Sequence, residues 1–103
     1  MLPLIEENID AIRSLCREFG VVRLDLFGSA AKGTFDRDRS DIDFLVEYPA
    51  GYDFGPWMTR YFELKERLEE LPGHSVDLVM VSAIRKPRFL ERVNQHRQVL
   101  YAA

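Results

Sequence analysis

Three aspartates lie in or beside apolar stretches of this sequence, where a carboxylate is costly to bury. Asp41 and Asp43 flank Ile42 at the start of the run DIDFLVEY, and Asp77 lies within SVDLVMV. Carboxylates that lie close together repel one another, and burial raises their pKa values further. Aspartates placed in this way therefore need a partner that offsets their charge.

Two kinds of partner could offset that charge. One is an arginine, and Arg37, Arg39 and Arg60 are the candidates in the sequence. The other is a divalent cation, which neutralises several carboxylates at once. An all-oxygen ligand set suits Mg²⁺ or Mn²⁺ rather than zinc. We favour the cation because it resolves the repulsion more completely.

Strand geometry predicts how the three aspartates meet. Side chains alternate along a strand, so Asp41 and Asp43 share one face, with Cα atoms about 6.6 Å apart. Segments 42–48 and 75–81 read as apolar strands joined through a helix, so we expect them to be parallel with a right-handed crossover. Their starts then lie at one edge of the sheet, which brings Asp77 to about 5 Å from the pair if the strands are neighbours.

A glycine-serine turn precedes the aspartate pair. Gly28 and Ser29 follow the apolar segment 21–27 and open a short helix. Glycine permits close backbone approach, while the serine hydroxyl and the N–H groups of a helix start can bind phosphate oxygens. By itself this pair is an ordinary turn. Eleven residues separate Ser29 from Asp41, so a single loop places a phosphate-binding turn beside the carboxylates.

The elements that must position these residues follow from apolar periodicity and from Gly and Pro breaks. We expect helices over 3–18, 28–33, 58–71 and 86–95, strands over 21–27, 42–48 and 75–81, an edge strand over 99–101, and loops over 34–40 and 49–56. The first two strands should be antiparallel neighbours. This predicts an α/β (α+β) fold with a mixed sheet of three to four strands flanked by helices. A length of 103 residues predicts one domain over 1–103.

Composition excludes several functional classes. A net charge of -3 argues against direct nucleic-acid binding. The single cysteine, Cys16, excludes an internal disulfide and a cysteine-based zinc site; we expect it in the core of a protein from a reducing cytoplasm. The sequence has no apolar run long enough for a membrane span and no signal peptide.

Charge is unevenly distributed along the chain. Segment 83–103 has five basic residues and one acidic residue, a net of +4, which leaves -7 for the rest. The segment is either a solvated basic helix or a surface for an anionic partner or the phosphates of a nucleotide. Within the loop over 34–40, Arg37 and Arg39 are either solvated or close enough to touch phosphate. Ser40 is expected to shape the turn that enters the aspartate strand.

A few residues allow both a structural and a functional interpretation. Tyr52, Phe54 and Trp57 are expected to cap the core, with partner contact or adenine stacking as the alternative. His74 and His96 are expected to be solvated surface residues.

The combined pattern resembles the DNA polymerase β nucleotidyltransferase superfamily. The matching features are Gly28-Ser29, the eleven-residue gap, Asp41-Ile42-Asp43 and a third acid, Asp77, on a later strand. The run LFGSAAKGTFDRDRSDIDFLVEY followed by VDLV looks like the minimal nucleotidyltransferases, the MntA-type antitoxins of HEPN/MNT pairs, over residues 5–101. Lys32 stands where such proteins usually have arginine, so the charge is kept but the bidentate fork is lost.

The resemblance implies roles for these residues. Asp41 and Asp43 would hold two Mg²⁺ ions, with Mn²⁺ as a substitute, and Asp77 would help hold the second ion and assist deprotonation of an acceptor hydroxyl. All three would be catalytic. The nucleotide-binding residues for ATP would be Gly28, Ser29, Lys32 and Ser40.

The resemblance also implies a partner. About 60 residues follow the aspartate pair and are needed for the core, so the acceptor must bind in an open cleft that another protein completes. In the resembled pairs the partner is a HEPN toxin, and AMP is transferred to a tyrosine hydroxyl on it. We therefore expect a hetero-oligomer and no membrane partner. The alternatives are a non-catalytic antitoxin that masks the toxin, and nucleotidyl transfer to a small molecule such as an aminoglycoside.

Overall fold

The order of helices and strands follows the alternation predicted from the sequence. The computed structural model describes residues 1–103. Its elements are α1 (Pro3–Glu6), α2 (Ile9–Phe19), β1 (Arg23–Phe27), α3 (Gly28–Lys32), β2 (Ile42–Glu47), α4 (Thr59–Glu70), β3 (Val76–Met80), α5 (Pro87–Gln95) and β4 (Gln98–Ala102), with single 3-10 turns at Pro56–Met58 and Val81–Ala83.

The four strands form one mixed sheet in the order β3-β2-β1-β4. β1 is antiparallel to β2 and to β4, whereas β2 and β3 are parallel. The predicted α/β fold, the antiparallel pair, the parallel pair and the edge strand are all confirmed. The parallel pair matters most for function because it places the starts of β2 and β3 at the same edge.

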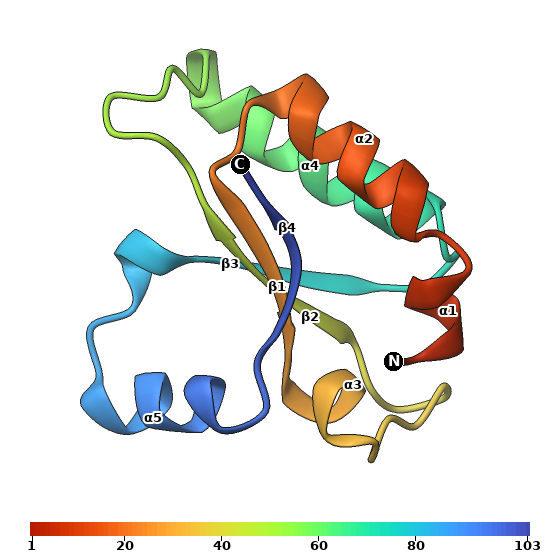
Figure 1. The fold of residues 1–103 in the computed structure, drawn as a ribbon. Coiled ribbons are helices and arrows are strands. Elements are labelled where there is room, and N and C mark those ends of the chain that lie inside the picture. Colours follow the sequence, from red (N-terminus) through yellow and green to blue (C-terminus); the bar gives the residue numbers. More distant parts are fainter.

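Helices cover both faces of the sheet (Figure 1). On one face, α2 and α4 pack on the strands in a cluster of 17 buried residues that includes Phe19, Phe44 and Leu64. On the other face, Val93 of α5 packs against Phe27 and Leu45. Side chains of one strand alternate between these two clusters, so the face under α5 also carries Asp43.

The first helix departs from the prediction. Segment 3–18 does not form one continuous helix but two, separated at Glu7 and Asn8. The Asn8 side-chain amide donates a hydrogen bond to the Leu4 carbonyl at 2.8 Å, and its backbone has φ -111°. An asparagine that bonds to nearby backbone in this way competes with helical continuation, which explains the break.

Cys16 occupies the core, as expected. Its side chain is fully buried among the residues of α2 and the sheet, and burial raises the pKa of its thiol to about 12. The thiol is therefore protonated and inert at neutral pH. Among the helices of this fold, none has the length and apolar character required to cross a bilayer.

Candidate active site

Two of the three predicted aspartates lie directly opposite each other in the sheet. The parallel register pairs Asp43 of β2 with Asp77 of β3. The residues that flank Asp43 in the chain, Ile42 and Phe44, are buried in the core under α2 and α4. Asp43 and Asp77 therefore lie at the same edge and on the face of the sheet away from that core.

The electrostatics show that the three carboxylates influence one another. Burial, then the charge of Asp77 and then that of Asp41 together raise the pKa of Asp43 to about 6. An isolated aspartate would have a pKa near 3.8. The site is therefore an electrostatically strained cluster of like charges, which is typical of functional rather than structural positions.

No arginine relieves this strain. Arg39 lies 4.0 Å from Asp36 and Arg60 lies 3.9 Å from Glu63, and none of the five ion pairs of the chain includes Asp41, Asp43 or Asp77. The alternative of arginine pairing is therefore wrong.

Asp41 is placed differently from the other two aspartates. It precedes the first residue of β2 and is exposed, so strand alternation does not govern its side chain. Its Oδ1 atom accepts a hydrogen bond from the Ser75 hydroxyl at 2.5 Å. In the positions they adopt, no three acidic, histidine or cysteine side chains form a group close enough to hold a metal ion. The metal role of the aspartates stays a prediction.

Gly28 shows how closely the turn approaches the aspartates. Its φ is +67°, and a Cβ atom added there would overlap the Oδ2 atom of Asp43. Only glycine both adopts this backbone conformation readily and leaves room for the carboxylate. The predicted close approach of the turn to the aspartates is therefore present. It brings Ser29 next to the acid edge, the edge of the sheet that carries Asp43 and Asp77. Carboxylate oxygens beside a glycine turn fit a hard divalent cation and phosphate groups.

The loop between α3 and β2 is organised by its own polar residues. The Ser40 hydroxyl accepts a hydrogen bond from the Asp36 amide at 3.1 Å, and the Asp36 side chain accepts one from the Asp38 amide at 2.9 Å. Ser40 thus shapes this turn, as expected. Lys32 is exposed in the last turn of α3. Nucleotide binding by Gly28, Ser29, Lys32 and Ser40 stays a prediction.

The two residues before β3 have contacts that sequence reasoning did not anticipate. His74 is half-buried, with Nε2 2.9 Å from the Arg37 carbonyl oxygen and its ring centroid 5.2 Å from that of Phe35. The prediction that His74 is a solvated residue is therefore wrong. Nothing in the sequence singles out Ser75, because its role depends on a residue 34 positions away. His96 is exposed, as expected.

A fourth acid, Asp25 of β1, was not identified from the sequence. It is fully buried, with Arg23 Nε 2.9 Å from one oxygen and the Arg97 guanidinium on the other. The sequence does mark Asp25 as unusual, because it interrupts the apolar segment 21–27 just as Asp43 interrupts the apolar segment 42–48. Because Arg97 is paired with Asp25, it is not part of a free basic surface. The four basic residues of segment 85–92 are exposed.

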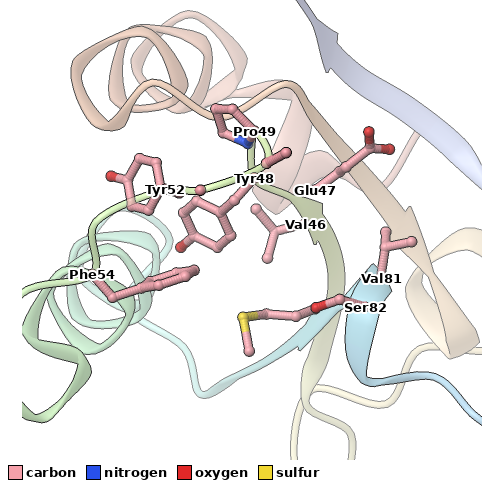
Figure 2. A pocket seen from close by; sticks show the side chains of 11 residues that line it. Val46, Glu47, Tyr48, Pro49, Tyr52, Phe54, Val81 and Ser82 are labelled. Carbon is pink, nitrogen blue, oxygen red and sulfur yellow. The ribbon is translucent and has the colours of Figure 1, made fainter.

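The opposite ends of β2 and β3 carry a largely apolar pocket of about 510 Å³, whose lining includes one acid, Glu47. Figure 2 shows Tyr48, Tyr52 and Phe54 gathered along one side of it. Their ring centroids are 4.6–4.9 Å apart, and the Tyr52 hydroxyl donates a hydrogen bond to the Phe19 carbonyl. The prediction that these aromatics cap the core is confirmed for Tyr52, which bonds to the core residue Phe19, whereas Phe54 packs on the rings of Tyr48 and Tyr52. It is wrong for Trp57, which is 94% exposed.

Comparison with known proteins gives matches over nearly the whole chain. A model of the nucleotidyltransferase domain family matches residues 9–100. Protein adenylyltransferase MntA of Thermococcus cleftensis is 37% identical over 90 residues, which cover 82% of this chain and 86% of that protein. A solved structure described as a minimal nucleotidyltransferase superposes with a TM-score of 0.75 at 34% identity, covering 93% of this chain and 92% of the other. A toxin-antitoxin crystal structure with AMP-PNP superposes with a TM-score of 0.71 at 26% identity, covering 93% and 74% of the two chains.

Proposed function

Because the chain belongs to the nucleotidyltransferase domain family, we propose that it is an antitoxin enzyme that transfers AMP from ATP to a hydroxyl group of a cognate HEPN toxin. The observation that carries this proposal is the register pair of Asp43 and Asp77 beside Gly28. The fold and the enzyme class that the sequence predicts are those of the relatives, which include a protein adenylyltransferase. The toxin, the acceptor and the metal ions are the parts that we propose.

The residues divide the chemistry between them. Asp41, Asp43 and Asp77 would hold Mg²⁺, which supplies charge neutralisation for the triphosphate and for the oxygens that attack and leave. The Gly28-Ser29 turn would bind the β- and γ-phosphates, with Lys32 and Ser40 at its flanks. The acceptor oxygen forms a bond to the α-phosphorus as the bond to the β-phosphate breaks. Asp77 assists removal of the acceptor proton, and pyrophosphate leaves.

The openness of the site supports a protein acceptor. Asp41 and Asp77 are both exposed at the sheet edge, and the residues after β2 are used to complete the sheet and its covering helices. The edge that carries these two aspartates is therefore open in this structure. A tyrosine on a partner protein could reach this edge, and the toxin-antitoxin structure with AMP-PNP among the structural neighbours supports a toxin as that partner.

The test combines the chain, the toxin encoded beside it, Mg²⁺ and ATP labelled at the α-phosphate. We expect the toxin to gain the label, and replacement of its acceptor tyrosine by phenylalanine to prevent this. Asp43→Ala should reduce transfer by about 100- to 1000-fold, because it removes charge stabilisation at the reacting phosphate. A complex that forms with the toxin but yields no labelled toxin would refute the proposed transfer. If the double variant Asp41→Ala/Asp43→Ala still neutralises the toxin at equal expression, binding alone suffices and the masking alternative is correct.

A further inference from the structure

We propose that Ser75 is a positioning residue for the metal and nucleotide site, because its hydroxyl fixes the carboxylate of Asp41. This inference rests on the proposed function, since it concerns the same site. It adds a residue that comes from outside the glycine-serine turn and the three aspartates.

Ser75 is bonded to two consecutive residues at the start of β2. Its hydroxyl donates to Asp41 Oδ1 at 2.5 Å, and its carbonyl accepts the Ile42 amide at 3.0 Å. The backbone bond sets the position of Asp41 along the sheet edge, and the side-chain bond sets its rotation. Asp41 and Ser75 are both exposed, so without this bond the carboxylate would rotate freely in water.

The backbone that carries Ser75 is itself anchored to the loop before β2. His74 Nε2 lies 2.9 Å from the Arg37 carbonyl oxygen, and the His74 ring packs on Phe35 at 5.2 Å between centroids. His74 thus holds the middle of the loop while Ser75 holds its end. These contacts link the loop to the start of β3 and so limit how far Asp41 can move relative to Asp77.

Such anchoring engages one oxygen of the Asp41 carboxylate and leaves the other free for a cation. The structure gives its carboxylate one hydrogen bond, at Oδ1, and no ion pair, so Oδ2 is available as a ligand. A ligand that is already oriented loses less freedom when the ion binds. Hydrogen-bond partners of metal ligands typically change metal affinity by about 10- to 100-fold when they are removed.

The test measures Mn²⁺ binding directly, by loss of the free Mn²⁺ signal in electron paramagnetic resonance, for the wild type, Ser75→Ala and Ser75→Thr. We expect Ser75→Ala to bind Mn²⁺ about 10- to 100-fold more weakly and Ser75→Thr, which retains the hydroxyl, to restore most of the affinity. Ser82→Ala is the matched control, because Ser82 is an exposed serine beyond the other end of β3. It should bind Mn²⁺ like the wild type.

Transfer kinetics with the toxin give a second readout. Ser75→Ala should need about 10- to 100-fold more Mn²⁺ for half-maximal transfer, with the wild-type rate recovered at saturating Mn²⁺. A general loss of structure would instead lower the rate at every Mn²⁺ concentration. If the wild type binds Mn²⁺ and Ser75→Ala binds it equally well, the inference is overturned and the proposed function stands. If the wild type binds no Mn²⁺, the proposed metal site and this inference both fall.

Discussion

The two ends of the parallel strand pair β2 and β3 differ in almost every physical respect. At the end where the strands begin, Asp43 and Asp77 face each other across the register without an arginine. At the end where they finish, Tyr48 and Phe54 pack edge to face with 4.7 Å between ring centroids. One end holds unbalanced carboxylates, and the other carries mainly apolar and aromatic side chains around a pocket.

This difference separates stability from chemistry within one small sheet. Neighbouring carboxylates are unfavourable in a folded protein unless a ligand compensates them, and proteins tolerate such strain where function requires it. The aromatic end and the core beneath α2 and α4 provide the favourable packing that offsets it. Substitutions at the acid end should therefore affect binding and transfer, whereas those at the aromatic end should affect stability alone.

The largest expected effect on stability comes from Gly28→Ala at the acid end. The new methyl group would overlap the Asp43 carboxylate in a backbone with φ +67°. We expect a loss of roughly 3 kcal/mol in the free energy of unfolding and a fall of about 100-fold in transfer, measured by urea unfolding and by labelling of the toxin. Gly33→Ala is the control, since its φ is +85° but no atom lies within 4 Å of the added methyl. It should cost about 1 kcal/mol and leave transfer unchanged; equal effects of the two substitutions would contradict the close approach.

An intermediate effect is expected at the aromatic end. Phe54→Ala removes a ring that packs against Tyr48 and Tyr52. We expect about 2 kcal/mol of destabilisation in urea, less than the roughly 3–5 kcal/mol for a fully buried phenylalanine, with Mn²⁺ affinity unchanged. Trp57→Ala, at a 94% exposed position, should change stability by less than about 0.5 kcal/mol. A loss of Mn²⁺ affinity in Phe54→Ala would show that the two ends are not independent.

The smallest effect concerns pH and the charge of Asp43. Its pKa is raised from 3.8 to about 6 in the folded chain, so the folded state binds the proton more tightly than the unfolded state. The free energy of unfolding of the metal-free protein should therefore fall as pH rises from about 4 to about 6. Asparagine does not titrate, so the free energy of unfolding of Asp43→Asn should not show this decrease. At pH 7 the variant should be more stable than the wild type by about 1–2 kcal/mol.

Urea unfolding in EDTA at pH 4.5 and pH 7 tests this expectation, because comparison of the two proteins cancels the other titrating groups. An identical pH dependence for wild type and Asp43→Asn would show that burial and the neighbouring carboxylates do not raise the pKa of Asp43 as the structure indicates. Added Mg²⁺ should stabilise the wild type at pH 7 and leave Asp43→Asn nearly unchanged, since a ligand stabilises only the state that binds it.

Much of the site could be predicted because it is encoded locally. Asp43 and Asp77 interrupt apolar strands, and Gly28 follows one directly, so alternation and glycine chemistry were sufficient to place them. Asp25 interrupts an apolar strand in the same way, but its partner Arg97 comes from the last part of the chain, so no local pattern shows that its charge is compensated. The predictions for His74 and Trp57 are wrong for a related reason. Whether a side chain in a turn is covered depends on which other segment lies beside it.

The sequence by itself determined the alternation of helices and strands, the parallel pair and the residue types of the acid edge, because periodicity and breaks act over a few neighbouring residues. Only the tertiary structure decided that Asp41 is held by Ser75, that Asp25 is paired with Arg97, and that no arginine reaches the three aspartates of the site. These are contacts between residues far apart in the chain. Their existence depends on the exact packing of elements, which no local pattern specifies.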